Sequence, residues 1–305
     1  MARTLIAALY KFVALDDFES LKQPIEEACR KRGIRGTLLL AQEGLNGTIA
    51  GEPEKVRDFL RHLKEDPRLV NLEHKESFAD SIPFIRLKVR LKKEIVTMGL
   101  PHVDPTKSVG TYVDAKDWNS LVKDPDVLVI DTRNDYESEV GTFEGSILPQ
   151  TESFRDFPQW FKGQKELRDA KKIAMFCTGG IRCEKATSYV LQNSDAEVYH
   201  LKGGILRYLE DITPEESLWH GECFVFDQRV TVDHNLEPGN FEQCFGCRRP
   251  IDEQAQNSPQ YQKGISCPQC YEQLSDEQKQ RFAERQKQIN LAKSRFQTHL
   301  GQADG

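Results

Sequence analysis

The sequence predicts a mixed α/β protein in three parts: an N-terminal α+β domain, a central domain with a parallel sheet, and a small cysteine-rich region with a helix. Three observations predict this class. Strand and helix signals alternate over residues 1–105, apolar runs separated by helical sequence follow over 106–220, and two C-x-x-C motifs lie within 221–305. A chain of 305 residues with 38% hydrophobic residues can form two or three domains, each with its own core.

The N-terminal part predicts a split βαβ, or ferredoxin-like, arrangement. An apolar run at 5–13 is followed by a stretch with helical spacing that ends at Gly33, with Pro24 expected in its first turn. Two strands come next, joined by the string EGLNG, whose Asn-Gly pair is typical of a tight hairpin turn. A second helix near Pro53 and two further extended stretches, one of them at 84–98, complete the order βαββαβ.

The middle part predicts a parallel sheet covered by helices. The runs VLVIDTR, KKIAMFC and AEVYHLKGG are short and apolar, and each precedes polar or helical sequence. Fully apolar strands that alternate with helices indicate a sheet buried on both faces. Ligands of such sheets bind at the carboxyl ends of the strands, so the loop after KKIAMFC is the first candidate site.

Charge and cysteine usage narrow the classes of partner and compartment. The net charge is +3 over 1–110, −11 over 111–243 and +2 over 244–305, so a polyanion would be held mainly by the two ends of the chain. No run of apolar residues is long enough for a membrane-spanning helix, so we expect no membrane partner. Cys29, Cys177, Cys183 and Cys223 lack the spacing of a secreted disulfide framework, so we expect the reducing cytoplasm.

The string AMFCTGGIRCEKA carries the strongest chemical signal. Cys177 follows a predicted strand and precedes a predicted helix, so loop N–H groups and the helix N-terminus favour an anion or a thiolate there. Arg182 adds a permanent positive charge. Such settings lower a thiol pKa from ~8.5 to ~3.5–7.5, which makes Cys177 a candidate nucleophile rather than a structural cysteine. The candidate amides of this loop are those of Thr178, Gly179, Gly180 and Ile181.

Cys183 lies six positions after Cys177, and its role stays open. A resolving thiol, a second participant in catalysis and simple packing are three alternatives.

The C-x-x-x-x-R loop from Cys177 to Arg182 resembles the active-site loop of the rhodanese superfamily, whose loop cysteine carries a persulfide. Upstream, residues 127–149 are similar to the rhodanese strand-and-turn signature, and downstream HLKGGILRYLE resembles its closing Gly-Gly turn and helix. Tyrosine-phosphatase relatives have five residues between Cys and Arg, whereas this loop has four. The resemblance implies that Asp131 and Arg133 support the loop. The positions that match the upstream signature are Asp131, Arg133, Tyr136, Gly145 and Ile147.

The wider pattern is more specific. EGLNGTIAG, CTGGIRCEKA, ECFVFDQRVTV and the trailing cysteine pairs together resemble the bacterial rhodanese-like tRNA uridine hydroxylases, from the first strand to about residue 270. This resemblance implies oxygen-dependent hydroxylation at C5 of the wobble uridine, position 34, to give 5-hydroxyuridine. It also implies the tRNA anticodon loop as partner and molecular oxygen as co-substrate. No flavin or nicotinamide signal is present in the sequence.

Two other functions fit parts of this sequence. A persulfide sulfurtransferase that passes sulfur from Cys177 to an acceptor would use the same loop. A non-catalytic RNA-binding scaffold is disfavoured because the nucleophile and the loop are intact.

The two C-x-x-C motifs predict a structural zinc ribbon. Cys244 and Cys247 are separated from Cys267 and Cys270 by 19 residues, a spacing that brings four thiolates together around one Zn²⁺. All four positions are filled by protein ligands, so the site is expected to be structural. Four cysteines without metal, reduced or paired as disulfides, are the alternative.

Basic residues at both ends are candidates for contact with the tRNA backbone. Solvated surface faces are the alternative. The strand-borne candidates are Arg86, Lys88, Arg90, Lys92 and Lys93, and the C-terminal ones are Arg248, Arg249, Lys279, Arg281, Arg285 and Lys287. The last helix, after the N-cap Ser275, carries a thin apolar stripe of Phe282, Ile289 and Phe296, which favours a solvated helix docked along one edge over a coiled coil.

Overall fold

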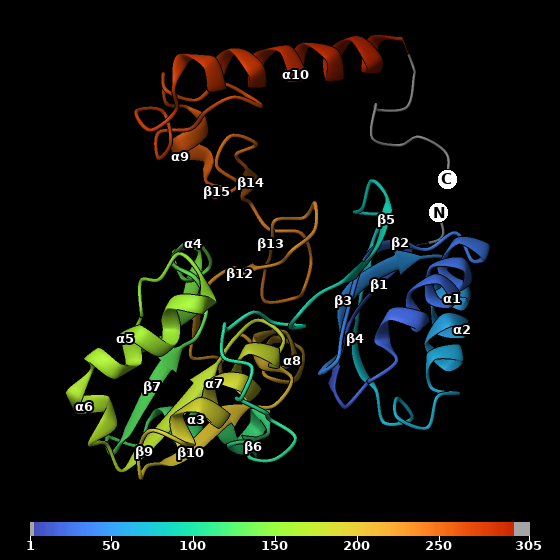
Figure 1. The fold of residues 1–305 in the computed structure, drawn as a ribbon. Coiled ribbons are helices and arrows are strands. Elements are labelled where there is room, and N and C mark those ends of the chain that lie inside the picture. The colour runs from blue at the N-terminus through green and yellow to red at the C-terminus, as the bar shows by residue number, and fades with distance from the viewer. Residues whose placement is uncertain (1–2, 296–305) are drawn as a thin grey trace.

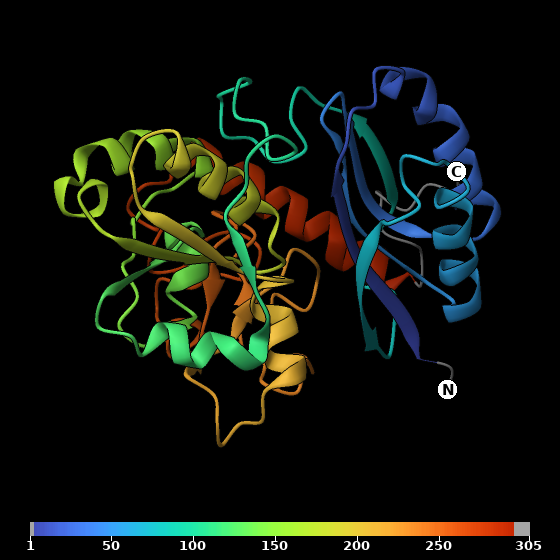
Figure 2. The same ribbon diagram turned by 90° about the horizontal axis from the view of Figure 1, so that it is seen from below.

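The N-terminal domain has the predicted ferredoxin-like architecture. The computed structural model describes residues 3–295. One five-stranded sheet has the order β4-β1-β3-β2-β5, in which β5 adds to the edge of the split βαβ and runs parallel to β2. Helices α1 and α2 cover the face of this sheet that points away from the middle domain (Figures 1 and 2). The elements are β1 (Thr4–Phe12), α1 (Phe18–Lys31), β2 (Arg35–Ala41), β3 (Gly44–Gly51), α2 (Pro53–Leu63), β4 (Glu73–Ala79) and β5 (Leu87–Leu91).

Alternation along β1 divides its side chains between the two faces of the sheet. Leu5, Ala7 and Leu9 belong to the core beneath α1 and α2. Ala8 and Tyr10 point to the opposite face, toward the middle domain, where they line a cavity. The open face of this sheet is therefore the wall of a site between domains.

Two local predictions in this domain were wrong. The hairpin between β2 and β3 turns at residues 42–43, because Ala41 pairs with Gly44, and Asn46-Gly47 lies inside β3. Gly47 instead allows β3 to pack close to β2, since a Cβ at this position would lie 2.1 Å from a carbonyl oxygen of β2. Pro24 lies in the interior of α1 rather than in its first turn. Pro24 has no N–H to donate to the carbonyl of Ser20. Ser20 is exposed, so water can bind this carbonyl.

The middle domain contains the predicted parallel sheet, in the order β6-β10-β9-β7. Ile173 and Met175 of β9 pack with residues of α5 and α7, whereas Ala174 and Phe176 pack with residues of α3 and α8. Helices thus cover both faces, as the apolar strands predicted. The elements are β6 (Thr111–Val113), α3 (Ala115–Val122), β7 (Val127–Asp131), α4 (Asp135–Ser138), β8 (Gly141–Phe143), α5 (Phe157–Gly163), α6 (Lys165–Arg168), β9 (Lys172–Phe176), α7 (Ile181–Leu191), β10 (Glu197–Leu201) and α8 (Gly204–Asp211).

The C-terminal part begins against the middle domain and ends at the cysteine cluster. β11 pairs with β8, and Cys223, Val225 and Val232 belong to the core of the middle domain. α10 lies at the far end of the cysteine-rich region (Figure 1), where Arg285 donates to the carbonyls of Phe245 and Gly264. Phe296 of the predicted stripe lies outside the described residues. The elements are β11 (Trp219–Gly221), β12 (Cys223–Phe224), β13 (Thr231–Val232), β14 (Glu242–Gln243), β15 (Pro250–Ile251), α9 (Glu253–Gln256) and α10 (Asp276–Ser294).

A buried ion cluster joins the first two domains. The Lys185 ammonium on α7 lies 2.7 Å from a carboxylate oxygen of Glu43 and 2.6 Å from one of Glu94. Glu43 also accepts the N–H of Ile95, and Asn46 donates to the carbonyl of Ile95. The EGLNG segment therefore holds the interdomain linker. None of the helices within residues 3–295 is long and apolar enough to cross a membrane.

Candidate functional site

A cavity of about 900 Å³ lies between the open face of the first sheet and the carboxyl end of the second. The N-terminal domain, the loop after β9 and the segment 225–236 all contribute to its lining. Cys177, Thr178, Gly179, Ile181 and Arg182 line it from the predicted loop. The topology thus places the cysteine loop where parallel sheets bind their ligands.

The sulfur of Cys177 is buried, and its surroundings favour the thiolate. The residue is 0% exposed, and the Gly180 N–H donates to Sγ at 3.1 Å. Burial alone would raise the pKa of Cys177, but the Cys183 thiol, the charge of Arg182 and the nearby backbone N–H groups together lower this pKa to about 6. Cys177 is therefore a thiolate at neutral pH, on the wall of the cavity.

The N-terminus of α8 holds the cysteine loop in this shape. The Ile205 N–H donates to the carbonyl of Cys177 at 2.9 Å, and the Leu206 N–H donates to that of Thr178 at 3.1 Å. A Cβ on Gly204 would lie 2.4 Å from the Cys177 carbonyl oxygen, so only glycine permits this packing. Because α8 binds these two loop carbonyls, the loop N–H groups remain available to the sulfur. Of the predicted amides, Gly180 bonds to Sγ, and the unpredicted N–H groups of Arg182 and Cys183 also lower the thiol pKa.

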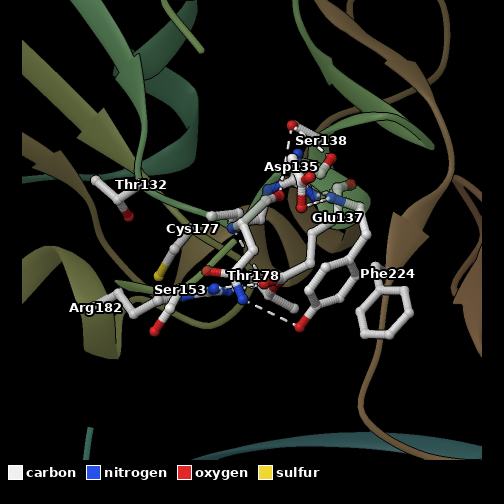
Figure 3. A network of polar contacts seen from close by, with 12 residues as sticks. Thr132, Asp135, Glu137, Ser138, Ser153, Cys177, Thr178, Arg182 and Phe224 are labelled. Carbon is white, nitrogen blue, oxygen red and sulfur yellow. Dashed lines mark hydrogen bonds and ion pairs between the residues drawn. The ribbon is translucent and has the colours of Figure 1, made fainter. Parts of the chain in front are cut away.

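Arg182 is held in a buried, two-pronged ion pair with Glu137. Its Nη1 and Nη2 lie 2.6 and 2.7 Å from the two carboxylate oxygens, and Nη2 lies 3.5 Å from the hydroxyl of Thr178 (Figure 3). Sequence reasoning missed Glu137, which lies within the signature at 127–149 but precedes Arg182 by 45 residues, too far for a spacing to pair the two. The guanidinium is thus oriented rather than free, and its charge still favours the thiolate of Cys177.

Asp131 and Arg133 support this pair from behind, at positions that the sequence singled out. They form a fully buried ion pair at 2.6 Å, and Arg133 also donates to the carbonyls of Glu137 and Gly141. The segment that carries Glu137 is therefore fixed by Arg133. Their role in the site is to position Glu137, and through it Arg182.

Cys183 is buried beside Cys177 and behaves differently. Burial, and then the neighbouring Cys177, raise the pKa of Cys183 well above its ordinary value, so this thiol stays protonated. Its sulfur lies 3.6 Å from the hydroxyl of Thr132. Cys183 therefore packs in the core, and its protonated thiol stabilises the thiolate of Cys177. Its roles as a resolving thiol or as a second participant in catalysis stay predictions.

The structure adds a second group of polar residues that the sequence did not reveal. Tyr10, Tyr112 and Glu184 line the cavity from three different elements. The Tyr10 hydroxyl donates to Glu184 at 2.9 Å, across the domain boundary. Glu184 lies within the CTGGIRCEKA string, but its partner Tyr10 is 174 residues away, so no spacing could have paired them.

The four cysteines of the C-x-x-C motifs converge. Their sulfur atoms all lie within 4.8 Å of one another, and three Sγ–Sγ distances are 3.9, 3.8 and 3.8 Å. Four sulfurs placed tetrahedrally at 2.3 Å from one ion would be about 3.8 Å apart. Cys244, Cys247, Cys267 and Cys270 therefore fit a four-coordinate metal ion with thiolate ligands.

Two of the predicted basic residues of the cysteine-rich region, Arg248 and Arg249, have different surroundings. The pKa of Lys88 is lowered by partial burial and then by the charges of Arg86, Arg90 and Arg248, so the β5 cations and Arg248 form one basic surface. Arg249 is instead paired with acidic residues, Asp135 at 2.6 Å and Glu139 at 3.5 Å.

Two family models match the first two domains of the chain. Residues 4–95 match the family described as the UPF0176 acylphosphatase like domain, and residues 114–211 match the rhodanese-like domain. A rhodanese-related protein of Thermoplasma volcanium is 24% identical over 34% of this chain and 95% of its own, with a TM-score of 0.29. A rhodanese-like domain from Anabaena is 18% identical over 36% of this chain and 78% of its own, with a TM-score of 0.30.

The relationship over the full length is much closer. A tRNA uridine(34) hydroxylase of Agrobacterium fabrum is 56% identical over 297 residues, which is 97% of this chain and 95% of that protein. The match spans the N-terminal domain, the cysteine loop and the cysteine cluster. The chain belongs to the tRNA uridine(34) hydroxylase family.

Proposed function

We propose that this protein is an oxidoreductase that hydroxylates C5 of uridine 34 in tRNA, with dioxygen as oxidant and Cys177 as nucleophile. The observation that carries the proposal is a thiolate, with a pKa of about 6, on the wall of a cavity large enough for a nucleobase. Membership of the family supplies the substrate. As an enzyme of tRNA, it would work in the cytoplasm.

The proposed chemistry begins with addition of the thiolate to C6, the electrophilic carbon of a pyrimidine. Addition makes C5 enolate-like, and this carbon attacks dioxygen. Loop N–H groups and the oriented guanidinium of Arg182 stabilise the enolate oxygen. One oxygen atom enters the base and the other leaves as water, so each cycle also takes two electrons and two protons from an external thiol reductant.

A wobble base can enter the cavity at a small cost in free energy, because it lies in a single-stranded loop and no base pair has to be broken. Phe226 lies in the cavity lining, is 61% exposed, and has its ring centre 5.9 Å from the guanidinium carbon of Arg182. An exposed aromatic face at this place suits stacking with a base of the anticodon loop.

The basic surface formed by Arg86, Lys88, Arg90 and Arg248 would contact the tRNA backbone. We propose a structural Zn²⁺ at the four cysteines, which would fix the segment that carries Arg248. Elemental analysis of protein purified without chelator should give about one zinc per chain. Metal-free protein with intact tRNA binding would contradict this role.

The test of the function is nucleoside mass spectrometry of tRNA incubated with the purified protein and a thiol reductant, in air and under argon. The proposal predicts 5-hydroxyuridine at position 34 in air and none under argon. Equal yields in both gases would exclude dioxygen as the oxidant. A parallel thiosulfate-to-cyanide assay tests the persulfide sulfurtransferase: thiocyanate formation without 5-hydroxyuridine would replace the proposed function by sulfur transfer.

A further inference from the structure

A second reactive group faces the same cavity as the thiolate. Glu184 lies in the first turn of α7, two residues after Arg182, and is partly buried. It accepts the hydroxyl of Tyr10 at 2.9 Å and also interacts with the hydroxyl of Tyr112. Both tyrosines line the cavity, so the carboxylate is held at its wall from two sides.

Tyr10 and Gly180 link the carboxylate to the sulfur. A Cβ on Gly180 would lie 2.9 Å from the Tyr10 hydroxyl, and the N–H of Gly180 itself donates to the sulfur of Cys177. The charge of Cys177 also contributes to raising the pKa values of both Tyr10 and Glu184, after the larger effect of burial. A base bonded to Cys177 would therefore have Glu184 as a neighbour.

Glu184 differs from the other carboxylates that line the cavity. Glu76, Glu210 and Asp227 each pair with an arginine, at 2.8, 3.3 and 2.7 Å. Glu73 is exposed to solvent. In the part of the chain that the structure describes, no cation is paired with Glu184, so this carboxylate is the one placed to exchange a proton with a bound molecule.

We propose that Glu184 is the general base that removes the C5 proton and so releases the modified base from Cys177. This step rests on the proposed function. The carboxylate takes the proton from C5, which already carries the new oxygen, and the C5–H electron pair forms the C5=C6 double bond. The C6–S bond then breaks, and its electron pair returns to Cys177 as the thiolate. The step is an elimination and needs no oxidant or reductant.

The charge balance of the cavity favours this order of events. Burial is the main cause that raises the pKa of Glu184, and the thiolate charge of Cys177 adds to it. Once the sulfur is bonded to C6, it carries no charge and this contribution disappears. The carboxylate form, which is the basic form, is therefore favoured in the adduct, where the base is needed.

Glu184→Gln, assayed in air with tRNA and a thiol reductant, tests the proposal. The amide keeps the shape and can still accept from Tyr10, but it cannot take the proton. We expect the rate of release of tRNA with 5-hydroxyuridine to fall by about 10²–10⁴-fold. A covalent protein–tRNA adduct carrying the added oxygen should accumulate, visible on a denaturing gel and by intact mass. Glu19→Gln, at an exposed carboxylate of α1 outside the cavity, should release product at the wild-type rate.

The outcomes separate this proposal from the proposed function. Wild-type product release by Glu184→Gln, or slow release without an adduct, would overturn the role of Glu184 as the base. Product formation by Cys177→Ser would instead overturn the proposed nucleophile. Unchanged tRNA affinity shows that Glu184→Gln is folded. Glu184→Asp keeps the carboxylate on a side chain that is one methylene shorter, so this variant should show slower release and adduct accumulation in weaker form.

Discussion

At Cys177, burial opposes ionisation while charge and hydrogen bonds favour it. The Gly180 N–H at 3.1 Å, the protonated thiol of Cys183 and the positive charge of Arg182 all act on one sulfur. Because the pKa of Cys177 is about 6, these contributions outweigh burial. The thiolate is therefore a property of the loop rather than of the cysteine alone.

The pH dependence of alkylation tests this property. A thiolate is the deprotonated form, so alkylation of Cys177 by iodoacetamide should rise with pH, with a midpoint near 6, and become level above about pH 7. Burial raises the pKa of Cys29 to about 12, so this cysteine should stay unreactive over the same range and serves as the internal control. Peptide mass spectrometry measures both. A Cys177 midpoint near that of an exposed thiol, about 8.5, would contradict the assignment.

The sequence could predict that Cys177, Arg182, Asp131 and Arg133 come together, because these residues lie within short motifs. It could not predict Glu137, whose pairing with Arg182 depends on the path of the chain through β7 and α4. It also could not predict that Tyr10 meets Glu184, because that contact forms only when two domains pack together.

Among the elements, the start of α8 decides the shape of the cysteine loop. Two N–H groups of α8 bind loop carbonyls, and Gly204, with φ of +66°, allows the close approach. The closing Gly-Gly turn of the sequence motif thereby has a physical role in the site.

Gly204→Ala tests this role. The added Cβ would meet the carbonyl oxygens of Cys177 and Thr178 at 2.4 and 2.6 Å, so the loop must shift and the pKa of Cys177 should rise. Hydroxylation at pH 7 should fall at least about twofold, since a rise of one unit from a pKa of about 6 leaves only about half of Cys177 as the thiolate. Gly163→Ala in α5, where a Cβ meets no atom within 4 Å, should keep wild-type activity. Equal activity of the two variants would argue against α8 as the element that shapes the loop.

The ion cluster on α7 sets how the first domain meets the loop. Lys185→Met should lower the free energy of unfolding by about 3–5 kcal/mol, because it leaves Glu43 and Glu94 without their cation. Chemical denaturation measures the loss. The triple variant Lys185→Met/Glu43→Gln/Glu94→Gln, which removes all three charges, should recover part of it. No loss in the single variant would show that the cluster does not join the domains.

Element types were easier to predict than their ends. The apolar strands and the 3.6-residue spacing identified β9, α7 and the parallel sheet correctly. The Asn-Gly signal failed in β3 because close packing between strands also requires glycine, as at Gly47, and a local pattern cannot tell the two demands apart.

For the whole molecule, all three parts of the chain line the cavity, and the cysteine-rich region also brings positive charge close to β5. Lys88 on β5 lies near Arg248 of the cysteine-rich region, although the two are 160 residues apart in the sequence. The charge pattern of the sequence predicted basic ends, and the fold explains how they join into one surface.

Charge reversal tests this surface. Lys88→Glu/Arg90→Glu should weaken tRNA binding and lessen the salt slope of log K by about 0.7–0.9 for each phosphate that the protein no longer neutralises. Binding measured from low to moderate salt gives the slope. Lys22→Glu/Lys31→Glu, on α1 at the outer side of the first sheet, is the matched control and should bind like the wild type. Equal slopes for both double variants would exclude β5 from the RNA interface.

The central claim is that the thiolate of Cys177 performs the reaction, and Cys177→Ser tests it most directly. The measurement is the amount of 5-hydroxyuridine at position 34 of tRNA after incubation in air with wild type, Cys177→Ser or Cys223→Ser. Cys223 is a buried cysteine of the core on the other face of the parallel sheet, and its pKa is raised to about 12. The account predicts product from wild type and Cys223→Ser and none from Cys177→Ser, whereas a wild-type yield from Cys177→Ser would contradict it.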